Sequence, residues 1–253
     1  MNLTHRTMGT VVSLDLRCAV SAELVAAAFE ILDEADARFS TFRPESELSR
    51  LGRGELELEA ASPALREVLR LGDAFARASG GAFSVWRDET LDANGIVKGW
   101  AAQRAAELLV AGGATDFCLN AGGDLITRGA PAPGLSWQAG IRDPEDAARL
   151  LGVVALGEGA MATSGAYERG GHIVDGRSGG ASDRWSSVTV LDADLTVADV
   201  LATAVFAMGA EGPGWAHEEF GSAVIALDAN GRLSVTGKVD WAADQGFRVA
   251  SPC

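Results

Sequence analysis

The hydrophobic residues of this chain recur with two periods, and each period predicts a different element. Alternation of apolar and polar positions predicts half-buried strands, whereas apolar residues three and four positions apart predict amphipathic helices. The predicted strands cover residues 10–16, 116–120, 137–141, 153–156, 187–191, 223–227 and 233–236. The predicted helices cover residues 21–39, 62–79, 99–111 and 198–208. Because the two kinds of element are interspersed without strict alternation, we expect one α+β domain over residues 1–253, with mixed sheets and packed helices.

The balance of charge narrows the classes of partner. The chain has 253 residues, of which 35 are acidic and 21 basic, with a formal net charge of -14. Nucleic acids and anionic membranes are bound chiefly through Lys and Arg, so the negative net charge argues against both as main partners. A small phosphorylated ligand stays compatible with this charge where a metal ion or backbone N–H groups supply a local positive field.

Three observations bear on location. The first nine residues are polar, and no segment approaches the roughly 20 apolar residues of a membrane span. The three cysteines, Cys18, Cys118 and Cys253, are odd in number and far apart, which is typical neither of a metal site nor of a disulfide framework. We therefore expect a cytoplasmic protein with reduced thiols and no membrane insertion.

Two glycine-rich segments are candidates for ligand contact. Residues 120–124, Asn-Ala-Gly-Gly-Asp, follow a predicted strand, and their glycines allow either a tight turn or the close approach of a pyrophosphate. Lys98 stands between Gly95 and Gly99, at the predicted start of a helix. This lysine is either part of a solvated helix start or a phosphate contact.

Two further positions carry chemistry of their own. Asp199 and Thr203 are four residues apart in a predicted helix, so their oxygens face the same side. The pair suits Mg²⁺, which takes few carboxylates together with water and phosphate oxygens. The alternative is a first-turn aspartate that complements the helix dipole beside a packed threonine.

His172 lies in a polar, glycine-rich segment, where a proton-transfer role and a structural role both remain open. Ser164 lacks the pattern of a nucleophile elbow, which argues against a Ser-His-Asp hydrolase.

Taken in order, these segments resemble one family, the ApbE-type FAD:protein FMN transferases. Eight short motifs, each weak alone, match in sequence order over most of the chain. They are residues 8–10, 39–49, 81–83, 92–99, 119–124, 162–165, 172–175 and 198–203. The resemblance implies an ApbE-like, T-fold-like architecture. It also implies that FAD is cleaved at its pyrophosphate and that FMN is joined through its phosphate to a threonine of an acceptor protein, with release of AMP.

The resemblance also implies a role for particular residues. Asp199 and Thr203 match metal positions, and a backbone carbonyl near Gly95 completes the protein's share of a Mg²⁺ site. His172 matches a catalytic histidine, which would take the proton of the acceptor threonine. The positions that match FAD contacts in relatives are Met8, Phe42, Ala82, Phe83, Ser84, Asp92, Lys98 and Val174.

The chain departs from the family pattern near its centre. Ser84 stands where most relatives have aspartate, and Val85 and Gly176 stand where proline is usual. The segment that leads from Val85 to the Asp92 motif is short. These departures place the chain among compact members of the family and bear on the contacts of Ser84 with FAD.

Two rival functions remain open. With water in place of threonine as the nucleophile, the same residues would give an Mg²⁺-dependent FAD pyrophosphatase that releases FMN and AMP. The second rival is a non-catalytic FAD-binding protein. An altered Asp199 or His172 would have favoured it, and both residues are present.

Overall fold

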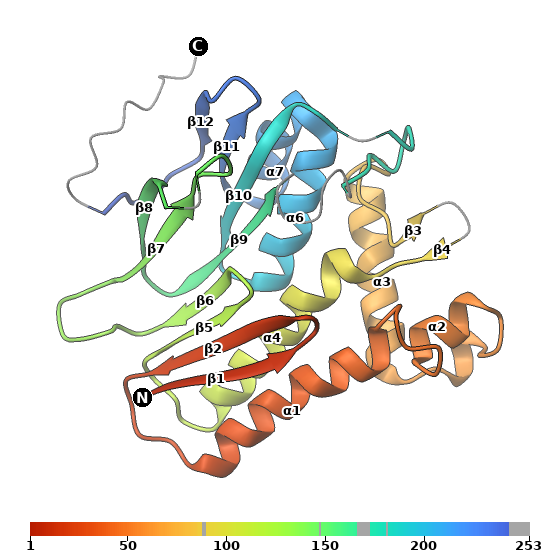
Figure 1. The fold of residues 1–253 in the computed structure, drawn as a ribbon, viewed down its shortest axis with the longest axis horizontal. Coiled ribbons are helices and arrows are strands. Elements are labelled where there is room, and N and C mark those ends of the chain that lie inside the picture. Colours follow the sequence, from red (N-terminus) through yellow and green to blue (C-terminus); the bar gives the residue numbers. More distant parts are fainter. Residues whose placement is uncertain (88–89, 147, 166–172, 181, 243–253) are drawn as a thin grey trace.

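The computed structural model describes residues 1–87, 90–146, 148–165, 173–180 and 182–242 (Figure 1). Its largest element is an eight-stranded sheet, with strand order β1-β2-β5-β6-β9-β10-β11-β12. The strands of this sheet are β1 (Asn2–Thr7), β2 (Thr10–Leu16), β5 (Phe117–Ala121), β6 (Asp124–Arg128), β9 (Gly159–Gly165), β10 (Trp185–Asp192), β11 (Ala223–Asp228) and β12 (Leu233–Thr236).

The α+β class is confirmed, but the expectation of mixed sheets needs a correction. All strand pairs in the described ranges are antiparallel. Short turns connect β1 to β2, β5 to β6 and β11 to β12. Such turns can join only antiparallel neighbours, because a parallel pair needs a long crossover.

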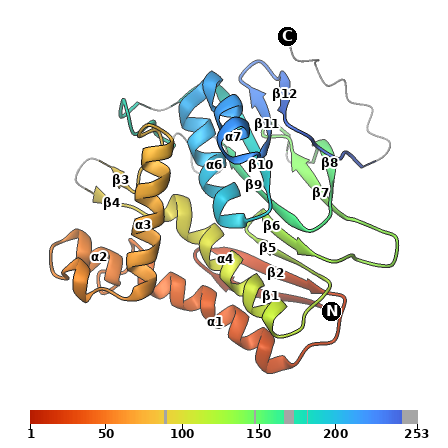
Figure 2. The same cartoon turned by 180° about the vertical axis from the view of Figure 1, so that it is seen from behind.

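Helices cover one face of the sheet, as the views from both sides show (Figures 1 and 2). They are α1 (Ala22–Phe39), α4 (Asn94–Ala111), α6 (Leu195–Met208) and α7 (Gly212–Phe220), with the short helix η2 (Gly209–Glu211) between the last two. Val12, Leu14 and Leu16 of β2 are at most 1% exposed and belong to the core on this face, as their alternation predicts.

A second, smaller core lies on the opposite face of the sheet. The hairpin of β7 (Trp137–Arg142) and β8 (Leu150–Leu156) packs against Ile225 and Leu227 of β11. The alternate residues of β11, Val224 and Ala226, belong instead to the core under the helices. Because both faces of β11 are covered, all of its residues are buried, and the five residues before Asp228 form a continuous apolar run.

The remaining elements lie beside the end of α1 (Figure 1). They are α2 (Glu47–Gly52), the short helix η1 (Leu58–Ala60), α3 (Pro63–Ala78) and the hairpin of β3 (Trp86–Arg87) with β4 (Thr90–Leu91). Ser21 and Ser62 are the N-caps of α1 and α3, and their hydroxyls accept backbone N–H groups at 3.1 and 3.2 Å. The caps are those that the sequence predicts.

One apolar stretch is longer and more hydrophobic than expected, since the sequence indicated no segment close to a membrane span. The segment Leu195–Phe220 is long and apolar enough for a membrane-spanning helix, and an 18-residue window within it has a mean hydropathy of 1.4. In this fold it forms α6, η2 and α7, and 72% of the window is buried inside the protein. Packing in the core therefore accounts for its hydropathy.

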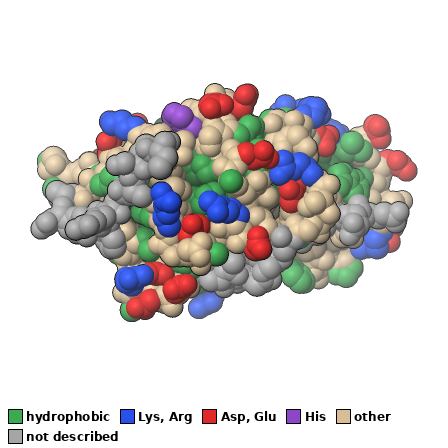
Figure 3. All heavy atoms as spheres, turned by 90° about the horizontal axis from the view of Figure 1, so that it is seen from above, with side chains coloured by type: hydrophobic (Ala, Val, Ile, Leu, Met, Phe, Trp, Pro, Cys, Tyr) green, Lys and Arg blue, Asp and Glu red, His purple; other side chains and the backbone are tan. Residues whose placement is uncertain are grey.

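The space-filling view shows how charge is distributed over one face of the protein. Seen from above, acidic and basic side chains are interspersed over the visible face (Figure 3). The net charge of -14 therefore does not gather on this face as one acidic patch.

Candidate functional site

Asp199 lies where α6 packs closely against α4. The approach depends on Gly99, because a Cβ atom there would lie 2.6 Å from the carbonyl oxygen of Leu195 and 2.7 Å from the Cβ of Asp199. The Gly99 amide donates a hydrogen bond to Oδ2 of Asp199 at 2.9 Å. Asp199 is only 6% exposed, so its carboxylate is held between the two helices.

Gly95 and Thr203 complete this group. In an α-helix the amide of residue 99 pairs with the carbonyl of residue 95, so the Gly95 carbonyl and the Asp199 carboxylate converge on one amide. A Cβ atom on Gly95 would lie 3.8 Å from Cγ2 of Thr203. The Thr203 hydroxyl in turn lies 3.2 Å from that of Ser164 on β9. The structure thus brings together the three predicted metal residues and adds Ser164, which no sequence motif assigned to this group.

Both helices begin earlier than the sequence predicted. α4 begins at Asn94, so Gly95 and Lys98 lie within the helix and do not precede it. α6 begins at Leu195 after the N-cap Asp194, which places Asp199 beyond the first turn. The effect of the helix dipole falls off within that turn, so the reading of Asp199 as a dipole partner is wrong.

The oxygen atoms of this group suit a hard cation. A carboxylate, a hydroxyl and a backbone carbonyl are ligand types of Mg²⁺, which keeps several positions for water and substrate phosphate. Within the described ranges, no three His, Cys, Asp or Glu side chains gather as a metal site. The group formed by Gly95, Asp199 and Thr203 therefore fits a metal that is held by one carboxylate and completed by a phosphorylated ligand.

Lys98 is oriented by a buried carboxylate. Its ammonium group forms an ion pair with Oδ2 of Asp124. Within the described part of the chain, no other group donates a hydrogen bond to that oxygen. The other oxygen, Oδ1, accepts the amide of Thr163 at 3.1 Å. Asp124 is 2% exposed and the Lys98 side chain 27%, so the lysine reaches from a buried anchor towards solvent. Sequence reasoning had placed Asp124 only in a glycine segment, because nothing local reveals that it is buried.

The glycine segment itself forms a tight turn. Gly122 and Gly123 connect β5 to β6 with φ angles of +66° and +108°, which residues with a side chain rarely adopt. The side chain of Asn120 accepts the Gly123 amide at 2.8 Å. The turn begins β6 at Asp124 and so places the carboxylate that holds Lys98.

A second neighbourhood is formed by the loop 81–84 and the turn 173–180. The Gly176 amide donates to the carbonyl of Ala82 at 3.0 Å, which places the chain of Val174 beside that loop. Ala82 is buried, so only its backbone can meet a ligand. His172, the predicted catalytic residue, lies outside the described residues and stays a prediction.

Phe83 connects the second neighbourhood to the metal group. Its ring is buried and lies 3.1 Å from the position of a Cβ atom on Gly95. It also packs edge-on against Phe75 of α3, with the ring centroids 6.4 Å apart. As with Ala82, the side chain of Phe83 is buried, so a ligand could meet only its backbone.

Ser84 and Asp92 shape the backbone around the β3–β4 hairpin. The Ser84 hydroxyl accepts the amide of Trp86 at 3.0 Å, and the Asp92 carboxylate accepts the amide of Asn94 at 2.9 Å. Asp92 thereby supports the first turn of α4, whose N-cap Ala93 has no side-chain acceptor.

Met8 and Phe42 stand in loops, and in the described residues no hydrogen bond or ion pair joins them to the others. Met8 has a φ angle of +50°, and in the described ranges all other residues with a positive φ are glycines. Backbone strain of this kind clusters at functional sites. Phe42 is 88% exposed in the loop before α2, where its ring is free to stack on a planar ligand.

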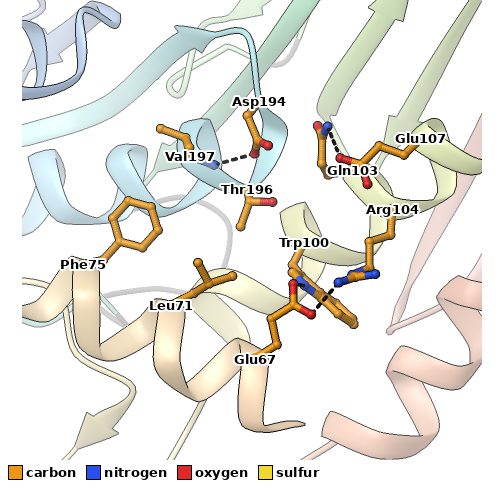
Figure 4. A pocket seen from close by; sticks show the side chains of 10 residues that line it. All are labelled: Glu67, Leu71, Phe75, Trp100, Gln103, Arg104, Glu107, Asp194, Thr196 and Val197. Atoms are coloured by element: carbon orange, nitrogen blue, oxygen red, sulfur yellow. Dashed lines mark hydrogen bonds and ion pairs between the residues drawn. The ribbon is translucent and has the colours of Figure 1, made fainter. Parts of the chain in front are cut away.

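A cavity of about 240 Å³ borders α3, α4 and the start of α6 (Figure 4). Its polar groups pair with one another: Glu67 accepts hydrogen bonds from Trp100 at 3.2 Å and from Arg104 at 2.5 Å. Gln103 accepts the amide of Leu195 at 3.0 Å. The cavity shares no residue with the predicted set, and its acidic, basic and amide side chains are already paired within the protein.

The order of these motifs along the chain agrees with a known family. A model of the ApbE family matches residues 8–87 and 85–226. The chain belongs to the ApbE family. The two matched ranges include all of the predicted metal, FAD-contact and catalytic positions.

Curated relatives within the ApbE family are similar over part of their length. An FAD:protein FMN transferase of Vibrio cholerae is 33% identical over 131 residues, which are 48% of this chain and 39% of that protein. One of Rhodobacter capsulatus is 35% identical over 156 residues, 58% of this chain and 29% of that protein. The chain thus matches less than half of the length of these relatives.

Solved ApbE structures share the fold over nearly the whole chain. The Vibrio cholerae flavin transferase ApbE superposes with a TM-score of 0.78, at 24% identity over 95% of this chain and 96% of that one. The ApbE protein of Thermotoga maritima gives a TM-score of 0.79, at 22% identity over 92% and 96%. At this level of identity the likeness establishes the ApbE fold.

The structure explains one departure from the ApbE pattern. Where proline is usual, Gly176 donates its amide to Ala82, which a proline cannot do. A Cβ atom on Gly176 would also lie 2.4 Å from the carbonyl oxygen of Gly81. The turn therefore packs closer to the loop 81–84 than a side chain at position 176 would permit.

Proposed function

We propose that this chain is an FAD:protein FMN transferase that requires Mg²⁺ and joins FMN to a threonine of an acceptor protein. The curated relatives of that name support the reaction class. The observation that carries the proposal is the meeting of Gly95, Asp199 and Thr203 between α4 and α6. Three residues from two distant parts of the sequence gather there with the donor atoms that a pyrophosphate-bound cation needs.

In the proposed site, Asp199, Thr203 and the Gly95 carbonyl would hold the Mg²⁺. When bound, the ion would offset the negative charge of the pyrophosphate and of the leaving group. Gly99 keeps the Asp199 carboxylate in place through its amide. Lys98, anchored on Asp124, would add a positive charge for a phosphate oxygen.

The remaining proposed roles concern FAD and the acceptor. Phe42 would stack on a ring of FAD, and the backbone around Ala82 and Phe83 would line the nucleotide. His172 would take the proton of the acceptor threonine as its oxygen attacks the FMN phosphorus. The bond between that phosphorus and the bridging oxygen breaks, and AMP leaves with that oxygen. Residues 1–253 would act as one domain, and the reaction would take place in the cytoplasm.

The test is FMN transfer by the Asp199→Asn variant. Asparagine keeps an oxygen for the Gly99 amide but removes the charge, so folding is retained while Mg²⁺ binding is lost. Protein, FAD, Mg²⁺ and an acceptor with a family motif are incubated, and covalent flavin is read by fluorescence in a denaturing gel. The matched control is Asp73→Asn, which removes an equal charge from an exposed position of α3.

We expect flavin-labelled acceptor with the wild type and with Asp73→Asn, and none with Asp199→Asn. Free FMN and AMP without labelled acceptor would assign the wild type to the pyrophosphatase class instead. FAD left intact by the wild type would leave a binding protein without turnover. Undiminished labelling by Asp199→Asn would overturn the metal assignment.

A further inference from the structure

The turn 175–180, which follows His172 in the sequence, is rigid by its own hydrogen bonds. The carbonyl of Asp175 accepts the amides of Ser178 at 3.1 Å and Gly179 at 2.8 Å. The Asp175 amide donates to the carbonyl of Gly180 at 2.9 Å, and the Asp175 carboxylate accepts the Arg177 amide at 2.9 Å. The turn therefore moves as one unit, and its orientation depends on what holds it from outside.

Arg177 provides the hold on one side. Its Nε and Nη2 atoms donate to the two oxygens of Asp175 at 2.9 and 2.8 Å, which is the two-point geometry of a guanidinium on a carboxylate. Its third nitrogen, Nη1, donates to Glu211 at 2.6 Å. The Arg177 hydrogen bonds hold the pKa of the Asp175 carboxyl below its usual range, in agreement with this two-point contact.

Glu211 ends η2, which continues directly from α6. The helix α6 carries Asp199 and Thr203, so Arg177 connects the turn to the element that bears the proposed metal residues. The stem of Arg177 also lies over the loop 81–84, because its Cγ is 3.6 Å from the position of a Cβ atom on Gly81. Three separate parts of the chain thus meet at one guanidinium.

We propose that Arg177 is a positioning residue that, through Glu211, fixes the chain following His172 relative to Asp199. This inference rests on the proposed function. Only two residues, Ile173 and Val174, lie between His172 and Asp175 in the sequence. The anchored turn therefore begins within three residues of the predicted catalytic position, although Arg177 itself touches no reacting atom.

The exposure of the pair separates positioning from plain stabilisation. The side chains of Arg177 and Glu211 are 36% and 61% exposed. Exposed ion pairs contribute little to stability, so loss of the Glu211 contact leaves the melting temperature almost unchanged. A small misplacement of a catalytic group, in contrast, lowers the rate strongly.

The experiment compares Arg177→Gln, Glu211→Gln, the double variant and Arg177→Lys. The control, Glu219→Gln, removes the same charge from an exposed position of α7. For each protein, kcat and KM for FAD are measured in the FMN-transfer assay, FAD binding by fluorescence titration, and the melting temperature by thermal denaturation.

For Arg177→Gln we expect a fall in kcat of about tenfold, with KM and FAD binding changed less than about twofold. Glu211→Gln should lower kcat by about threefold, and the double variant no further than Arg177→Gln alone, since the two act through one contact. Arg177→Lys should recover part of the rate, because lysine keeps the charge but loses the two-point geometry.

Several results would overturn the inference: multiplied losses in the double variant, a loss in KM or FAD binding alone, or the same loss in Glu219→Gln. An unchanged kcat in Arg177→Gln would overturn it as well. Failure of the proposed function is a separate outcome, because then the wild type itself would label no acceptor.

Discussion

Gly99 is the residue on which the close contact between α4 and α6 depends, and its replacement by alanine tests that geometry. The new methyl group would lie 2.6 Å from the carbonyl oxygen of Leu195 and 2.7 Å from the Cβ of Asp199. Both neighbours belong to the rigid core, so they cannot rotate away as the end of a long side chain can. The helices must move apart, and the Asp199 carboxylate moves with α6.

The magnitude follows from two opposing effects. Replacing glycine by alanine within a helix contributes about 0.5–1 kcal/mol, because the unfolded chain loses freedom. Overpacking a core by one methyl group costs about 1–3 kcal/mol. We therefore expect Gly99→Ala to lower the free energy of unfolding by about 1–2 kcal/mol, as measured by urea denaturation. The control is Gly214→Ala in α7, where a Cβ atom meets nothing within 4 Å and a small gain in stability is expected.

The displaced carboxylate should also weaken ligand binding. In the wild type, Mg²⁺ together with FAD should raise the urea midpoint, because a ligand of the folded state stabilises it. This increment should be reduced or absent in Gly99→Ala and retained in Gly214→Ala. The reasoning would be refuted if Gly99→Ala were as stable as Gly214→Ala and kept the full increment.

Three further predictions concern other parts of the fold. Gly176→Pro introduces the residue that the family resemblance leads us to expect, but it removes the hydrogen bond to Ala82. We therefore expect the free energy of unfolding in urea to fall by about 2 kcal/mol or more. An unchanged free energy of unfolding would contradict the close packing of that turn. The hydrogen bond from Arg104 holds the pKa of Glu67 below its usual 4.5. The charged Glu67 therefore stabilises the folded state above pH 4.5, and this contribution is lost as the pH falls through the lower pKa of the folded state. Glu67→Gln should accordingly flatten the decline of the free energy of unfolding with acid. Partial burial raises the pKa of the Cys118 thiol to about 11, so iodoacetamide at pH 8 should leave Cys118 unmodified in peptide mapping. Rapid labelling of Cys118 would contradict this raised pKa.

Part of this fold could be read from local signals. The alternation in β2 and the serines that cap α1 and α3 act over a few residues, and the structure has them where predicted. The strands β1, β6 and β9 and the helices α2 and α7 escaped prediction. In β1 most residues are polar, and in β9 small residues carry no alternation, so neighbouring strands, not local pattern, decide their conformation.

The candidate site divides in the same way. The spacing of Asp199 and Thr203 on one helix face is a property of the sequence, because the helical period alone sets it. Their meeting with Gly95 is not, since it requires α4 and α6, about a hundred residues apart, to pack at van der Waals distance. Asp124 and Ser164 were missed for the same reason: the contacts with Lys98 and Thr203 come from the order of strands in the sheet.

By itself, the sequence determined the class of fold, the family and the residue types available for chemistry, because motif order and helical or strand period are encoded locally. Tertiary structure alone decided that the sheet is antiparallel, that Asp199 is buried beyond the first turn of its helix, and that Arg177 joins three parts of the chain. Those features depend on contacts between residues distant in sequence. Such contacts arise only when the apolar faces of the elements pack against one another and carry the polar groups with them.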